Sequence, residues 1–139
     1  MITLTLLIQL IGRNPDMDGL ATYYNGPGPY TRSGELFTLD MPICAVDAMF
    51  WPEMEGKTLL IVSDDGRIAS LRVADTGHLY DAGEFHRSAY SKRYVHPENP
   101  AAWGPPYRVV VDIPELAFLA VFGDSETRHV WCWVMESTE

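Results

Sequence analysis

The sequence predicts a mostly β domain, either a barrel or a sandwich, and three observations support this prediction. Short runs of apolar and β-branched residues recur along the chain between turn-forming residues. An Asp-Gly pair at positions 65–66 separates two of these runs, which is a hairpin signal. One stretch, residues 114–122, carries both the entry and the exit signals of a helix. At 139 residues, the chain has the length of one domain with one core.

Charge and motif content narrow the classes of partner. The 19 acidic residues outnumber the 10 basic residues, and the formal net charge is −9. Such a chain repels phosphate backbones and anionic bilayers, so neither nucleic acid nor insertion into a membrane is expected. The 4 histidines lack the spacing of metal ligands, and no phosphate-binding loop or nucleotide fingerprint occurs. We therefore expect no metal and no cofactor.

The two cysteines, Cys44 and Cys132, are too few for a zinc motif. They are compatible with one disulfide or with two small buried apolar side chains, and we slightly favour the second alternative. Spacing alone does not decide between them.

The N-terminal segment, residues 1–18, is predicted to be a strand followed by a linker. Thr3, Thr5 and Gln9 alternate with leucine and isoleucine, as in a half-buried strand. The segment has no basic start and no small-residue cleavage site, and it is too short to cross a bilayer, so it is not expected to be a signal peptide. An unpaired strand here would be able to join the sheet of a protein partner.

The middle of the chain alternates between short strands and loops. A strand is predicted at residues 20–24, and the Asn-Gly-Pro-Gly-Pro run after it excludes regular structure. Short strands are next predicted at 36–39 and 43–48, and then the two arms of the hairpin at 57–62 and 68–74.

The last part of the chain contains a long irregular segment, one helix and two strands. Residues 79–106 show no sustained period, which indicates a functional loop or insertion. A strand is predicted at 107–113. The helix follows at 114–122, because proline suits its first position and Gly123 suits its exit. The final strand is predicted at 129–135.

Asp75 stands where the second hairpin arm meets a Thr-Gly turn signal. A rigid scaffold usually displays its chemistry at such strand ends, although many aspartates in turns only bond their own backbone. Asp75 is therefore the first catalytic candidate.

Four short motifs, taken in order, resemble the double-psi β-barrel domains, and most closely the rare lipoprotein A type of peptidoglycan lytic transglycosylases. Expansins, barwin, the family-forty-five endoglucanases and the three-aspartate domain of lytic transglycosylases are related to this type. The resemblance implies an all-β fold, a six-stranded double-psi β-barrel at residues 19–136, with one or two short helices and a long inserted loop. The motifs are residues 19–24 (GLATYY), 31–37 (TRSGELF), 72–77 (RVADTG) and 110–114 (VVDIP).

The resemblance also implies site residues. It places catalytic carboxylates at Asp75, Asp112 and Glu35. Asp112 has the alternative role of capping the helix, and Glu35 that of a solvated side chain. Asn25 lies near the base of the endoglucanases, and its amide cannot accept a proton, which argues against inverting hydrolysis by two carboxylates. Substrate-binding roles are expected for Tyr23, Tyr24, Tyr30, Asp47, Thr76, His78 and Trp103, where the aromatic faces suit sugar rings.

The expected function is that of a peptidoglycan lytic transglycosylase or glycan hydrolase acting through a protonated carboxylic acid, with Asp75 favoured as that acid. Because no signal peptide is evident, the sequence does not fix the location. A bacteriophage-encoded protein is expected in a virion or in the host cytoplasm or periplasm, and a protein of another origin is expected outside the cytoplasm by another export route. The alternative is a non-catalytic barrel that serves as a structural or glycan-binding component of a virion, tail or cell-wall assembly.

Overall fold

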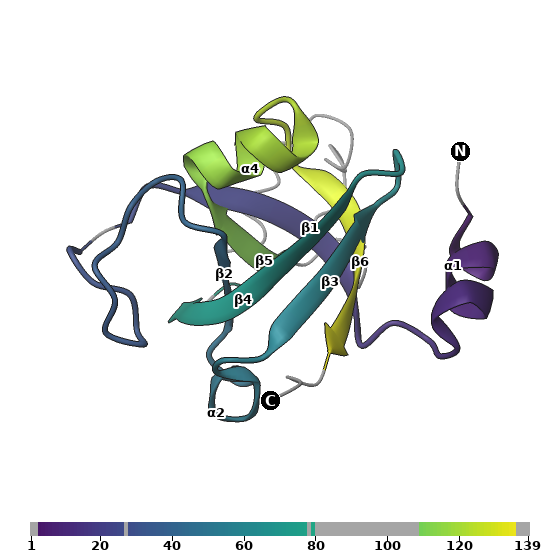
Figure 1. Cartoon of the computed structure of the whole chain (residues 1–139), viewed down its shortest axis with the longest axis horizontal. Coiled ribbons are helices and arrows are strands. Elements are labelled where there is room, and N and C mark those ends of the chain that lie inside the picture. The colour runs from purple at the N-terminus through teal and green to yellow at the C-terminus, as the bar shows by residue number, and fades with distance from the viewer. Residues whose placement is uncertain (1–2, 27, 78, 80–108, 136–139) are drawn as a thin grey trace, which may run out of the picture.

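A computed structural model of the chain describes residues 3–26, 28–77, 79 and 109–135. Six strands close into a barrel in the order β1-β5-β2-β4-β3-β6 (Figure 1). This is the all-β double-psi barrel that the sequence predicts. The elements are α1 (Leu4–Ile11), β1 (Met17–Tyr24), β2 (Ile43–Asp47), α2 (Trp51–Met54), β3 (Thr58–Ser63), β4 (Ile68–Gly77), β5 (Val109–Pro114), α4 (Glu115–Phe122) and β6 (Arg128–Met135).

The N-terminal segment is a helix, α1, so the predicted N-terminal strand is wrong. Leu4, Leu7 and Ile11 recur at helical spacing, and all three join one apolar cluster with Val62 and Trp133 of the barrel. The apolar residues fit a period of two and a period of 3.6 equally well, and packing against the barrel selects the helix. Because this segment is a helix, it offers no free strand to pair with the sheet of a partner.

The predicted hairpin between β3 and β4 is confirmed, and Asp75 lies on its second arm, β4. Ser63 begins the turn, and its backbone N–H donates to the carbonyl of Arg67 at 2.9 Å. β4 then continues to Gly77, because its end pairs in parallel with β2. Thr76 and Gly77 therefore lie within the strand and not in a turn, and Asp75 lies two residues before its end.

The loop between β1 and β2 does not contain the strand predicted at 36–39. Among the described residues of this loop, one isolated bridge forms, between Tyr30 and Leu36. Gly26 has a φ of +77° and lies against the ring of Phe37, where an added Cβ atom would come to 2.5 Å from Cδ1. The loop folds back on itself at this contact.

We expect Gly26→Ala to destabilise the protein more than Gly34→Ala. Both glycines have a positive φ, but a Cβ atom on Gly34 would meet nothing within 4 Å. Gly34→Ala should lower the free energy of unfolding by about 1 kcal/mol, through backbone strain alone. Gly26→Ala should lower it by roughly a further 1–3 kcal/mol, because the ring of Phe37 must move. Urea unfolding measures both, and equal losses would contradict the close contact.

The predicted helix after β5 is confirmed as α4, which ends at Gly123 in the left-handed conformation. It lies across one end of the barrel (Figure 1). Phe118 and Phe122 are buried and pack against each other in a tilted arrangement, with an interplanar angle of 59° and ring centroids 4.7 Å apart. α4 thereby closes the barrel end with side chains that face the core.

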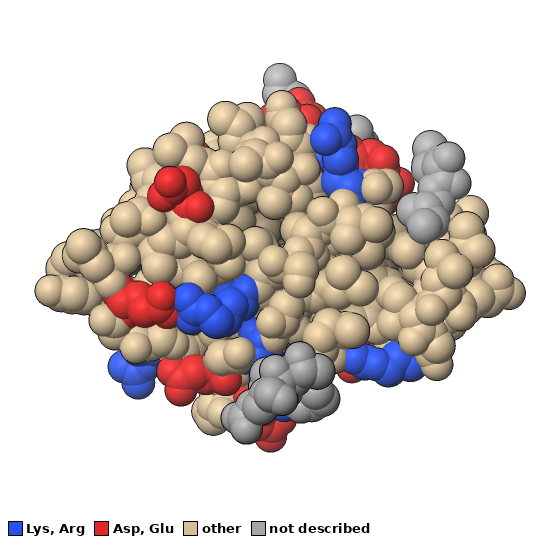
Figure 2. Space-filling model, in the orientation of Figure 1, with Lys and Arg blue, Asp and Glu red and all other residues tan. Residues whose placement is uncertain are grey.

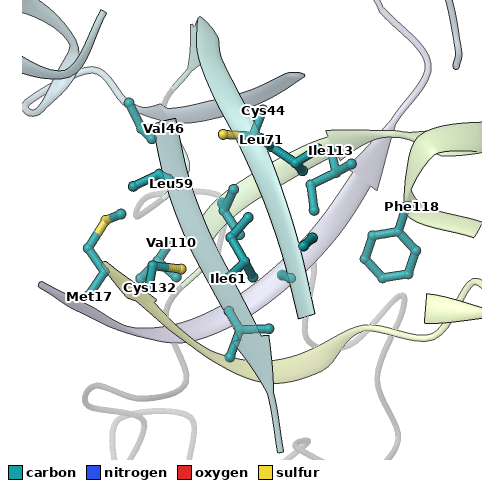
Figure 3. Close-up of a cluster of buried hydrophobic side chains, with 14 of the residues drawn as sticks. Met17, Cys44, Val46, Leu59, Ile61, Leu71, Val110, Ile113, Phe118 and Cys132 are labelled. Atoms are coloured by element: carbon teal, nitrogen blue, oxygen red, sulfur yellow. The ribbon is translucent and has the colours of Figure 1, made fainter. Parts of the chain in front are cut away.

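The barrel interior is filled by aliphatic side chains from all six strands, with Phe118 at one end (Figure 3). Cys44 on β2 and Cys132 on β6 are free thiols in this core, which confirms the favoured alternative. Burial raises the pKa of both thiols.

Two further findings complete the architecture. Most of the predicted insertion, 79–106, lies outside the described residues. The structure describes three short helices, α1, α2 and α4, where the resemblance implied one or two. None of these three helices is long and apolar enough to cross a membrane.

Candidate functional site

The site is built on a row of residues that crosses four neighbouring strands. Thr22 on β1 is paired with Asp112 on β5, Asp112 with Ala45 on β2, and Ala45 with Asp75 on β4. The neighbours Ala21, Cys44 and Ile113 belong to the barrel core. Because side chains alternate along a strand, Thr22, Ala45 and Asp112 point away from the core. On β4 the core residue Val73 lies two positions before Asp75, and a register shift between Cys44 and Ala45 places Asp75 beside Ala45. The row therefore lies on the outer face of the barrel.

Ala45 separates the two carboxylates and forms the floor between them. Two strand spacings place the backbones of Asp75 and Asp112 about 10 Å apart. The small Ala45 side chain leaves this interval open, and the loop after β1 walls it in. The result is a cavity of about 360 Å³, lined by Tyr24, Gly26, Gly28, Tyr30, Phe37, Ala45, Asp75, Thr76, Gly77, Leu79 and Asp112.

Asp112 is a buried acid. It is 7% exposed, and burial raises the pKa of its carboxyl group to about 7. The Thr22 hydroxyl donates a hydrogen bond of 2.8 Å to Oδ1, which lowers the pKa in part, whereas the charge of Asp75 raises it. Near neutral pH a substantial fraction of Asp112 therefore carries a proton, and this carboxyl group lines the cavity.

Asp75 is held as an acceptor by three donors. The Tyr24 hydroxyl donates to Oδ2 at 2.8 Å, and the backbone N–H groups of Arg32 and Thr76 donate to Oδ1 at 3.1 and 3.0 Å. An ionised carboxylate has the acceptor sites for all three donors. Burial, and after it the charge of Asp75, raises the pKa of Tyr24, so this hydroxyl keeps its proton. The two aspartates thus have different environments in one cavity.

We expect Thr22→Val to raise the pKa of Asp112 above its wild-type value, because the hydrogen bond that it removes favours the carboxylate. Carbon-13 NMR titration of the Asp112 carboxyl measures this. Thr76→Val is the matched control, since that hydroxyl donates to the Val46 carbonyl at 3.0 Å and not to a carboxylate. An Asp112 pKa that stays unchanged or falls in Thr22→Val would contradict the assignment.

The other predicted site residues divide into two groups. Tyr30 and Thr76 line the cavity together with Tyr24. Tyr23 packs against Phe118 on the other side of β1, with ring centroids 5.6 Å apart, and the Asp47 carboxylate accepts the N–H of Met49 in a local turn. Neither of these two lines the cavity.

Glu35 also lies away from the cavity lining. It forms a two-pronged ion pair with Arg72, with Oε1–Nη1 and Oε2–Nη2 distances of 2.6 and 2.8 Å. His78 and Trp103 lie outside the described residues.

Two site residues, Thr22 and Ala45, are absent from the sequence-based prediction. The sequence does contain a signal for Thr22, because Thr22 and the predicted Tyr24 are polar groups at i and i+2 and so lie on one face of a strand. Ala45 has no such signal, since its role arises from the pairing of β2 with both β4 and β5. Within the described residues, no three His, Cys, Asp or Glu side chains gather to hold a metal ion.

Comparisons with known proteins bear on the fold. No family model matches the chain, and no curated protein matches it. Among solved structures, it is similar to an apo-expansin from Clavibacter michiganensis, with a TM-score of 0.53 and 16% sequence identity. The match covers 88% of this chain and 52% of the expansin chain, so this chain spans about half the length of that protein. At this identity, the likeness shows a shared fold.

Proposed function

We propose that this barrel cleaves glycosidic bonds of a cell-wall polysaccharide, as a peptidoglycan lytic transglycosylase. One observation carries the proposal: the Asp112 carboxyl group, whose pKa is about 7, lines a cavity opposite the separately held Asp75. A glycosidic oxygen leaves readily only when it is protonated, and a raised carboxyl pKa supplies that proton near neutral pH. The resemblance of four short sequence motifs to the rare lipoprotein A type supports peptidoglycan as the polysaccharide.

The geometry favours Asp112 over Asp75 as the acid. Asp112 donates its proton to the glycosidic oxygen as the bond to the anomeric carbon breaks. Asp75 remains an acceptor for its three donors, and its negative charge stabilises the positive charge that develops on the sugar. The Asp112 carboxylate then takes the proton of the sugar's own 6-hydroxyl, whose oxygen bonds to the anomeric carbon. This step closes an anhydro ring and returns the proton to Asp112.

Product analysis tests the proposal. Purified peptidoglycan is incubated with the wild type and with Glu53→Gln, a control that removes one exposed charge on α2, and the soluble products are identified by mass spectrometry. Anhydro-muropeptides from both proteins are expected. Reducing-end products instead would identify a hydrolase in which water replaces the 6-hydroxyl, and no release at high protein concentration would refute cleavage.

A glycan-binding barrel without chemistry is the second candidate, and Tyr30 favours it. Tyr30 lines the cavity yet is 65% exposed, which suits stacking on a sugar face. Co-sedimentation with insoluble peptidoglycan separates the candidates. Retention of the wild type without product release, and weaker retention of Tyr30→Ala, would support binding alone.

A further inference from the structure

The loop that walls the cavity carries a tight turn, residues 31–34, which docks on β4. The Gly34 N–H donates to the Thr31 carbonyl at 2.9 Å, and the Thr31 N–H donates to the Glu35 carbonyl at 2.8 Å. The Thr31 side chain is buried and accepts the N–H of Glu35 at 3.2 Å. Because Glu35 closes this bonded unit, it moves together with the turn.

Three consecutive contacts join the turn to one strand. The Arg32 N–H donates to Asp75, the Ser33 N–H donates to the Ala74 carbonyl at 3.1 Å, and Glu35 forms its ion pair with Arg72. Arg72, Ala74 and Asp75 all belong to β4. The hydrogen bond from Arg32 to Asp75 touches the site and lies at one end of this row of contacts. The ion pair between Glu35 and Arg72 lies at the other end.

From this arrangement, we propose that Glu35 and Arg72 form a clamp that holds the Arg32 N–H on the Asp75 carboxylate. Both are positioning residues that fix the orientation of Asp75 without touching substrate. The effect of Glu35 and Arg72 on catalysis rests on the proposed function. The clamp itself is a structural proposal that does not depend on that function.

The chemistry of the pair suits a clamp. A guanidinium and a carboxylate that share two parallel hydrogen bonds fix direction as well as distance. The hydrogen bond to Arg72 lowers the pKa of Glu35, which keeps the carboxylate ionised. Both side chains are about two-fifths exposed, at 42% for Arg72 and 40% for Glu35, so salt screens the pair. On the face that Figure 2 shows, acidic and basic groups meet in small mixed clusters on a largely uncharged surface.

Amide hydrogen exchange measured by NMR tests the clamp directly. Glu35→Gln should speed exchange at Arg32 by about tenfold or more, because local opening of the turn becomes easier. The control Glu53→Gln removes the same charge from α2 and should leave that rate unchanged. The charge-swapped double variant Glu35→Arg/Arg72→Glu should restore slow exchange. An unchanged rate at Arg32 in Glu35→Gln would overturn the proposal.

Kinetics then separate positioning from direct catalysis. Glu35→Gln should lower kcat about tenfold and leave KM within about twofold, because Asp75 is misoriented while the cavity is intact. Loss of all turnover with normal Arg32 exchange would identify Glu35 as a catalytic group and overturn the clamp. If the wild type releases no product, the proposed function fails, and the exchange rates alone still decide for or against the clamp.

Discussion

Replacing Asp112 with asparagine should lower the rate of muropeptide release by about 10³-fold or more. An amide has no proton to give to the leaving oxygen, and general acid catalysis contributes roughly 10²–10⁴-fold to such reactions. The oxygen of the introduced amide can still accept the Thr22 hydrogen bond, so the row across the four strands is retained. Initial rates at saturating peptidoglycan measure the effect.

Asp75→Asn provides the comparison for this variant. It removes the negative charge that stabilises the developing cation, and it should also be strongly impaired, whereas Glu53→Gln should match the wild type. Circular dichroism and a thermal melt confirm that each variant is folded. An Asp112→Asn rate within about threefold of the wild type would remove Asp112 from the role of acid.

Activity should fall as the pH rises above about 7, because Asp112 then loses the proton that it donates. The descending limb of the pH–rate profile should have a midpoint near this pKa. Thr22→Val should move that midpoint upward, since the loss of its hydrogen bond raises the pKa.

The same group makes stability depend on pH. The pKa of Asp112 is about 7 in the folded protein and about 4 in the unfolded chain, so the folded state holds the proton more tightly. The resulting stabilisation is fully present below about pH 4 and is lost as the pH rises through about 7. The shift corresponds to about 4 kcal/mol. Subtracting the pH curve of Asp112→Asn from that of the wild type isolates this contribution, and a flat difference would contradict it.

Local signals in the sequence predict much of the fold. The Asp-Gly turn predicts the hairpin from β3 to β4, and the proline and glycine that flank α4 predict that helix, because neighbouring residues set both structures. Asp75 is indicated first by its position at a strand end and then by motif resemblance, which also indicates Asp112, and the structure brings both carboxylates to one cavity.

The remaining features depend on contacts between distant residues. α1 is a helix because Leu7 packs on Val62 and Trp133, a contact that the local alternation of residues 3–10 does not contain. The environment of Asp112 arises where Thr22 and Ala45 meet it across strands, with register shifts in both parallel pairs. Glu35 is paired with Arg72, 37 positions away in the chain, which separates it from the cavity. Sequence spacing carries no information on such partners.

The proposed mechanism depends most on a protonated Asp112 at neutral pH. Site-resolved carbon-13 NMR titration of its carboxyl group in the wild type measures this directly, with Asp112→Asn used to assign the signal. The mechanism predicts a midpoint near pH 7. A midpoint near 4, the ordinary range of an aspartate, would show an ionised Asp112 with no proton to donate and would contradict it.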